Sequence, residues 1–292
     1  MRLADYFARI GYEGPSEPTD AVLGRLVRRH SLSVPFENLD VQLGQSLTLD
    51  PENAFDKIVN RNRGGWCYEQ NGLFGWALAE VGFEVTRVAA AVRRNERGEI
   101  ADANHLCLVV HTTGSDKPWL ADVGFGGSML APIPLEESQH EQTPFDIGLR
   151  RTDDGHWQFW ESAGDGEFSY DFLDEPADEQ ALIAKCKFLQ TSPESGFVQS
   201  LVAQIRTPDS HKTLRGKVLS HTSSSGRHTD LLKSADELVD VLRDTFRLDV
   251  PEAAHLWPRV ERRHEELLEE IQSASATKSV SQERKRSRQE QA

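Results

Sequence analysis

Apolar residues in the first eighty positions recur at the spacing of helices that bury one face. Residues 3–10 follow the i, i+3, i+4, i+7 pattern of such a helix. Asp50-Pro51 places a capping residue before a proline, which predicts a helix start. A later apolar set at helical spacing predicts a helix that begins near Cys67 and stops at Gly82.

Beyond Gly82 the pattern changes to short runs rich in β-branched and aromatic residues. The runs over 83–92, 105–110 and 119–123 are separated by Gly and Asp clusters, as is typical of strands. Asp153-Asp154-Gly155 lies between two further apolar runs and predicts a hairpin. Short, regularly spaced strands of this kind indicate an antiparallel sheet or barrel.

The last third of the chain mixes both patterns. A helix is predicted over 180–189, and Ser234 with Glu237 forms a capping box that opens another. Helical spacing resumes over 259–271. From Ser273 onward the chain is polar, which predicts a solvated, disordered tail.

Composition narrows the class of protein. The 292 residues are 38% apolar and include 13 Phe and 6 Trp, enough for a sizeable core. A net charge of −14 argues against a nucleic-acid surface. No run approaches the roughly 20 apolar residues of a membrane helix, and the N-terminus lacks the apolar core of a signal peptide. Three cysteines without a CxxC pair disfavour a disulfide framework or a bound metal, so we expect a cytoplasmic protein.

Cys67 is the first residue whose context indicates chemistry. It follows Gly64-Gly65, which permit a tight turn and close approach, and it precedes a predicted helix. A helix N-terminus offers partial positive charge and unpaired N–H groups, which favour a thiolate and could bind an oxyanion. The alternative is that Cys67 is a small buried apolar residue, as Cys107 and Cys186 are expected to be.

A thiolate nucleophile needs a base and a group that orients the base. His105 begins a strand-like run, and Asp122 is the lone acid of another apolar run. Because an acid in an apolar strand is costly unless it is paired, the two side chains could satisfy each other from adjacent strands. A hydrogen-bonded core histidine and a turn aspartate remain equally open readings of these residues.

Several ordered segments resemble the arylamine N-acetyltransferase family. The cysteine segment is similar to the RGGxCxExN signature of that family, and the other matches keep their order over roughly residues 3 to 250. The matching segments are RGGWCYEQN over 63–71, HSLSVPFENLD over 30–40, Asn104-His105, DVGFG over 122–126 and TSPESGF over 191–197.

The resemblance implies a catalytic triad of Cys67, His105 and Asp122, arranged as in cysteine proteases. It also implies an α+β multidomain fold: a helical bundle (1–82), an antiparallel β-barrel (83–176), and a linking helix with an α/β lid (177–272). The charged tail (273–292) lies outside the resemblance. Implied acceptor-pocket residues are Phe36, Tyr68, Val92, Phe125 and Phe197, and implied residues for the thioester and pantetheine are Gly124, Gly126 and Gly127.

The implied reaction is a ping-pong transfer. Acetyl-CoA, as co-substrate rather than a permanent cofactor, would acetylate Cys67, and an arylamine or hydrazine would then take the acetyl group. A cysteine hydrolase or a transglutaminase-like, amide-forming acyltransferase could use the same triad. Water exclusion distinguishes the two enzyme classes, because an open site would hydrolyse the acyl-enzyme. A binding module that kept the fold is disfavoured because all three triad positions are present.

Overall fold

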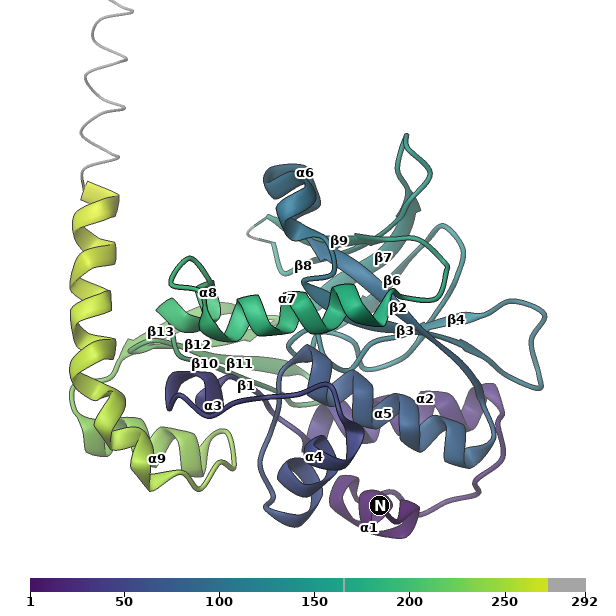
Figure 1. Cartoon of the computed structure of the whole chain (residues 1–292), viewed down its shortest axis with the longest axis horizontal. Helices are drawn as coiled ribbons and strands as arrows, with labels where there is room; N and C mark the ends of the chain where they lie inside the picture. The colour runs from purple at the N-terminus through teal and green to yellow at the C-terminus, as the bar shows by residue number, and fades with distance from the viewer. Residues whose placement is uncertain (165, 273–292) are drawn as a thin grey trace, which may run out of the picture.

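The computed structural model describes residues 1–164 and 166–272 (Figure 1). The predicted tail over 273–292 lies outside the described residues. The N-terminal part is largely helical and packs beneath the strands that follow it. Its helices are α1 (Leu3–Ile10), α2 (Asp20–Ser33), α3 (Leu39–Gln42), α4 (Pro51–Phe55), the π-helix η1 (Asp56–Asn60) and α5 (Cys67–Val81).

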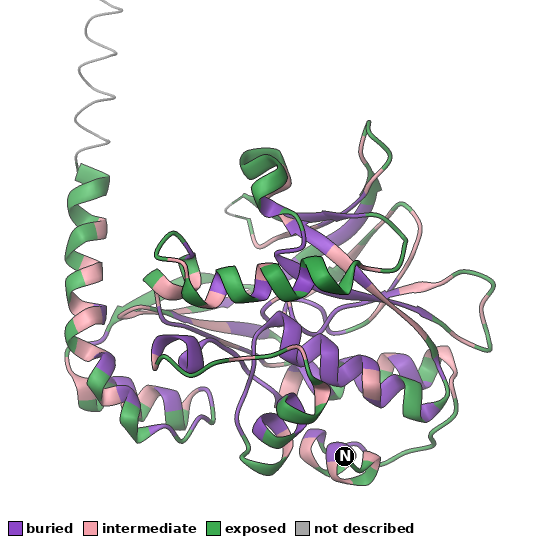
Figure 2. Ribbon diagram, viewed as in Figure 1, coloured by how far each residue is buried: buried purple, intermediate pink, exposed green. Residues whose placement is uncertain are grey.

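Helix α5 has the ends that the sequence predicts. The Glu69 carboxylate accepts a hydrogen bond from the Trp66 backbone N–H over 3.2 Å and so satisfies a donor at the helix start. Gly82 ends the helix in the left-handed region at φ 103°, where a residue without Cβ is favoured. Most residues of α5 are buried, as Figure 2 shows, so Cys67 begins a helix that is largely enclosed by the protein.

The helix predicted from Asp50-Pro51 starts as expected but changes from an α-helix to a π-helix. Asp50 caps α4 through its side chain, which accepts from the Glu52 N–H. After Phe55 the backbone continues as the π-helix η1, in which each turn holds an extra residue. A single π turn of five residues is too short for the spacing of apolar residues to distinguish it from an α-helix.

A short strand interrupts the helical part. β1 (Phe36–Glu37) pairs antiparallel with β10 (Val202–Arg206), and Phe36 lies opposite Gln204. Phe36 also forms a parallel bridge to Gly65. The turn before Cys67 is therefore connected to a sheet formed mainly by the C-terminal third.

The predicted antiparallel sheet is present and has eight strands in a nearly closed barrel, with β5 and β6 at its edges. The Asp153–Gly155 turn joins β7 to β8, which confirms the predicted hairpin. Short helices α6 (Arg94–Arg97) and η2 (Gly98–Ala101) separate β2 from β3. In spatial order the strands are β5 (Ile133–Pro134), β4 (Trp119–Ala121), β3 (His105–His111), β2 (Glu84–Val92), β9 (Glu167–Phe172), β8 (Trp157–Ser162), β7 (Phe145–Arg151) and β6 (Ser138–Gln142).

The C-terminal third forms a second sheet beside the barrel (Figure 1). Helix α7 (Glu179–Thr191) runs from the barrel toward this sheet, and α9 (Ala235–Asp244) begins at the predicted Ser234 cap. The sheet order is β1, β10, β11 (Ser210–Arg215), β12 (Val218–Ser223) and β13 (Gly226–Leu231), and the remaining helices are α8 (Gly196–Gln199), η3 (Pro251–Leu256) and a helix over 257–272.

These elements confirm the predicted fold class. The divisions after residues 82 and 176 and the cytoplasmic location stay predictions. Over the described residues, no helix combines the length and apolar character that crossing a bilayer requires. Three apolar clusters hold the chain together: one joins the N-terminal helices to the barrel, one lies under the second sheet, and a third surrounds Cys67.

Candidate active site

The turn before Cys67 is formed by close backbone contact. A Cβ on Gly64 would lie 2.2 Å from the Pro35 carbonyl oxygen, so this position accepts glycine alone. The Gly65 N–H donates to the same carbonyl over 3.2 Å. Cys67 is 3% exposed at the first position of α5, where backbone N–H groups lack helical partners.

His105 and Asp122 are paired, as predicted. His105 is the first residue of β3, and Asp122 follows the last residue of the adjacent strand β4. His105 Nε2 lies 2.7 Å from Asp122 Oδ2, and both side chains are buried. Because a carboxylate only accepts, Nε2 carries the proton and Nδ1 is left as the basic nitrogen of the neutral ring.

Asn71 and Gly124 hold Asp122 in place. The second carboxylate oxygen, Oδ1, accepts from Asn71 Nδ2 over 2.7 Å and from the Gly124 N–H over 2.9 Å. Burial would raise the pKa of Asp122, but the neighbouring His105 and the hydrogen bonds from His105, Asn71 and Gly124 outweigh it and lower the pKa. Asp122 is therefore an anion at neutral pH.

The Asp122 loop also reaches Cys67 directly. A Cβ on Gly124 would lie 2.8 Å from Cys67 Cα and 2.6 Å from Asn71 Nδ2. Asn71 also donates to the Leu106 carbonyl over 2.6 Å, which ties α5 to the strand of His105. The structure thus brings the three predicted residues together and adds Asn71, which sequence reasoning missed despite its place in the cysteine signature.

The surroundings of Cys67 oppose the ionisation that its helix position favours. Burial raises the pKa of the thiol, and the negative charge of Asp122 acts in the same direction. A backbone hydrogen bond at Leu106 opposes both effects without overcoming them. Ionisation of the thiol therefore needs a base that takes its proton, rather than the helix N-terminus alone.

Three of the five predicted pocket residues lie in or against one apolar cluster with Cys67. Phe36, Tyr68 and Phe197 belong to the apolar cluster that contains the thiol. The ring of Trp66 makes edge contacts with Tyr68 and Phe197, at 5.4 Å and 5.3 Å between centroids. The Tyr68 hydroxyl donates to the Ala103 carbonyl over 2.6 Å, so this ring is locked.

The other two predicted pocket residues lie on the barrel side. The ring of Phe125 contacts His105 at 5.3 Å between centroids and stacks on Phe168 at 5.2 Å. Val92 ends β2, and its N–H donates to Asn104 Oδ1 over 2.7 Å. Both residues pack against the barrel cluster rather than the cluster around Cys67.

Gly126 and Gly127 have a packing role besides the predicted one. Both have positive φ, and a Cβ would lie 2.4 Å from Gln204 Oε1 at Gly126 and 3.1 Å from Arg206 Cγ at Gly127. The missing side chains let this loop pack against β10. Contact of these glycines with pantetheine stays a prediction.

A buried charge network beneath the Cys67 turn was not predicted. Lys57 Nζ lies 2.9 Å from Asp40 Oδ2, 3.0 Å from Glu69 Oε2 and 3.6 Å from Glu37 Oε1. Arg63 contacts Glu37 and Asp40, each over 2.9 Å. Burial alone would lower the pKa of Lys57, but the carboxylates outweigh it and raise the pKa. The position of Glu69, three residues after the cap residue Trp66, was the signal that could have revealed its capping role.

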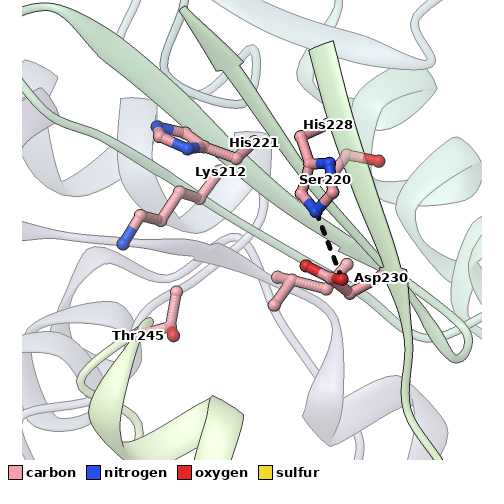
Figure 3. A pocket seen from close by; sticks show the side chains of 7 residues that line it. Lys212, Ser220, His221, His228, Asp230 and Thr245 are labelled. Atoms are coloured by element: carbon pink, nitrogen blue, oxygen red, sulfur yellow. Dashed lines mark hydrogen bonds and ion pairs between the residues drawn. The ribbon is translucent and has the colours of Figure 1, made fainter.

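Among residues 1–164 and 166–272, no three His, Cys, Asp or Glu side chains are placed to hold a metal. A hollow of about 210 Å³ lies on the second sheet, where His228 Nε2 is 3.3 Å from Asp230 Oδ1. Figure 3 shows Lys212 and Thr245 among the side chains that line it. None of its lining residues belongs to the cluster around Cys67.

The chain is similar to known N-acetyltransferases in sequence and in fold. A sequence model described as N-acetyltransferase matches residues 21–255. An arylamine N-acetyltransferase of Mycolicibacterium smegmatis is 36% identical over 260 residues, which cover 87% of this chain and 94% of the relative. The solved arylamine N-acetyltransferase of M. tuberculosis superposes with a TM-score of 0.81 at 34% identity, covering 89% of this chain and 99% of that one.

A third comparison includes a ligand. The arylamine N-acetyltransferase of Mycobacterium marinum in complex with CoA has a TM-score of 0.81 and 34% identity, covering 90% of this chain and 98% of that one. The fold and these relatives define an acetyl-CoA-dependent acyltransferase. Within this class, the chain belongs to the arylamine N-acetyltransferase family.

Proposed function

We propose that the protein transfers an acetyl group from acetyl-CoA to an arylamine or hydrazine through an acetyl-Cys67 intermediate. The observation that carries this proposal is the His105–Asp122 pair, joined by Asn71 and Gly124 to the first turn of the helix that bears Cys67. The CoA complex of the M. marinum relative supports the choice of donor.

In the first half-reaction, the Cys67 thiol gives its proton to His105 Nδ1, and the sulfur attacks the thioester carbonyl carbon of acetyl-CoA. The bond from that carbon to the CoA sulfur breaks, and the imidazolium returns the proton to the CoA thiolate. Asp122 stays ionised throughout and stabilises the imidazolium, since its own pKa is lowered. Backbone N–H groups at the start of α5 are suited to hold the transient oxyanion.

In the second half-reaction, the acceptor nitrogen attacks the acetyl carbon on Cys67. The carbon–sulfur bond breaks, the nitrogen loses one proton to His105, and that proton returns to the Cys67 sulfur. Phe36, Tyr68 and Phe197 form the wall beside the thioester, and Phe125 and Val92 form the barrel side. In this proposal Gly124, Gly126 and Gly127 lie along the pantetheine arm.

Intact-protein mass spectrometry tests the proposal. Acetyl-CoA should add one acetyl group, and an arylamine should discharge it. The adduct should be lost in Cys67→Ala and kept in Cys186→Ala, a matched control because Cys186 lies in the same apolar cluster. An adduct on Cys67→Ala protein would contradict the proposed carrier. Discharge by water as fast as by amine would instead support the cysteine hydrolase.

A further inference from the structure

Strand β13 forms an open edge of the second sheet. It is the last strand in the sheet order, and among the described residues no strand pairs with its outer side. All six of its residues are exposed. The outward N–H and C=O groups of such an edge are able to pair with an extended segment of another molecule. β13 is therefore a surface on which the sheet can be extended.

Charged side chains approach this edge in a defined order. His228 lies directly opposite His221 of β12, which lies directly opposite Lys212 of β11. Because directly opposite residues share a face, these three basic side chains form a row, and all three line the hollow in Figure 3. Asp230 is the next residue of β13 on this face, and its Oδ1 lies 3.3 Å from His228 Nε2. The basic row thus ends at the open edge with an acid two residues further along the strand.

A second copy of the same strand is complementary to this arrangement. When identical strands pair about a twofold axis they run antiparallel, and one residue at the centre lies opposite itself. With Thr229 at the centre, His228 of each copy lies opposite Asp230 of the other. With His228 or Asp230 at the centre, two imidazoles or two carboxylates would face each other. Charge complementarity therefore selects the register centred on Thr229.

We propose that the protein associates with a second copy of itself through β13, in the antiparallel register centred on Thr229. The two five-stranded sheets then join into one continuous sheet. Facing threonines at the centre and an opposite-charge pair on each side of it are favourable across antiparallel strands. In the same register Leu231, which is 53% exposed, lies opposite Arg227 of the second copy, whose aliphatic stem covers it.

The contact is small and lies apart from the proposed acetyl carrier. Pairing along a single six-residue strand gives an interface at the low end of the size range, which is typical of transient complexes. The association should therefore depend on protein concentration. No residue of β13 belongs to the apolar cluster around Cys67, so changes in β13 should separate association from acetyl transfer.

Sedimentation of the full chain, from about 1 μM to about 500 μM, measures the association. The average mass should rise from that of one chain toward that of two, and a constant monomer mass would overturn the proposal. Thr229→Lys sets two ammonium groups opposite each other and should weaken the dimer at least about tenfold. The control Ser220→Lys adds the same charge on the same face of the neighbouring strand, and should change the dissociation constant less than about threefold. Equal effects of the two variants would place the contact elsewhere and overturn the proposal.

Charge exchange tests the register. His228→Glu creates two like-charged pairs across the axis, and Asp230→Lys places two cations opposite imidazoles, so each should weaken the dimer about tenfold. The variant that carries both changes restores opposite charges at each position. Its dissociation constant should return to within about threefold of the parent value. Additive weakening in the combined variant would overturn the proposal.

Disulfide trapping covers the case in which a charged variant does not fold. The three native cysteines are buried, so an added cysteine at the edge is the accessible thiol. Under a mild oxidant Thr229→Cys should give a covalent dimer, because directly opposite Cβ atoms lie about 5 Å apart. In the control His228→Cys the two cysteines are diagonal neighbours, about 7 Å or more apart, and should cross-link far less. Equal yields from the two variants, or no dimer from Thr229→Cys, would overturn the proposal.

Discussion

Lys57 donates to both carboxylate oxygens of Glu69, over 3.1 Å and 3.0 Å, and both side chains are almost entirely buried. Glu69 in turn accepts from the Trp66 N–H, one residue before Cys67. The ammonium group thus supports the cap of the helix that begins at Cys67. We expect Lys57 to position the proposed nucleophile without touching the proposed substrates.

Replacing Lys57 with Met should destabilise the protein strongly. Three carboxylates would lose their shared cation, and breaking a buried pair costs about 3–5 kcal/mol. Urea unfolding measures the loss. Arg61→Met is the control, because Arg61 pairs with Asp56 at the surface and should cost at most about 1 kcal/mol. Similar unfolding midpoints for the two variants would contradict this account of the network.

His30 predicts a defined loss of stability in acid. Its Nδ1 lies 2.8 Å from the Tyr6 hydroxyl and its Nε2 lies 3.2 Å from Gln70 Oε1, and burial lowers its pKa to about 3. In the unfolded chain His30 binds a proton near pH 6.5, whereas in the folded chain it stays neutral down to about pH 3. The stability that the neutral imidazole contributes is therefore fully present above about pH 6.5 and is lost progressively below it. The slope is about 1.4 kcal/mol per pH unit, or about 2 kcal/mol by pH 5.

Urea unfolding between about pH 8 and pH 5 measures this slope. In His30→Gln the contribution of the imidazole is absent, so the variant should lose about 2 kcal/mol less than the parent over that range. The parent itself serves as the control, since other titrating groups are common to both proteins. Equal losses in the two proteins would place the acid sensitivity elsewhere.

Alkylation of Cys67 by iodoacetamide tests how Asp122 acts on the thiol. The direct charge of Asp122 raises the pKa of Cys67, whereas its support for a protonated His105 favours the thiolate. We expect the second effect to win, so Asp122→Asn and His105→Gln should both move the alkylation midpoint to higher pH. A downward shift in Asp122→Asn would show that direct repulsion dominates and that no ion pair forms.

Gly124→Ala should block transfer. The new Cβ would lie 2.8 Å from Cys67 Cα, a backbone contact that can be relieved only by moving the helix start or the Asp122 loop. A displacement of about 1 Å at a reacting group costs roughly a hundredfold in rate. The control is Gly114→Ala, where the nearest atom would be 3.6 Å away and φ is not positive. Equal rates of acetyl transfer in the two variants would contradict the close approach.

The sequence predicted the elements whose signal is local. Helix α5 was predicted from the helical spacing of its apolar residues and from the glycines on either side of it. The β7–β8 hairpin was predicted from its Asp-Gly turn. The pairing of His105 with Asp122 was an open possibility on the residues alone, and the family resemblance selected it from ten histidines.

The remaining features depend on contacts that no local pattern contains. β1 has two residues, too few for a periodic signal, and its partner lies across more than half of the chain. The Lys57 network assembles from four separate segments, so its members read as ordinary surface charges in sequence.

The pairing of β1 with β10 also sets the order in which the site can mature. During synthesis Phe36 and Cys67 leave the ribosome long before Gln204, so Phe36 cannot pair with its neighbour until most of the chain has been made. Such distant contacts form late because closing a long loop is entropically costly. We expect Cys67 in stalled nascent chains to acquire acetyl-CoA reactivity only once β10 has emerged, which mass analysis of chains of increasing length would reveal. If Cys67 is the acetyl carrier that we propose, late pairing delays its reactivity until the second sheet can fold beside it.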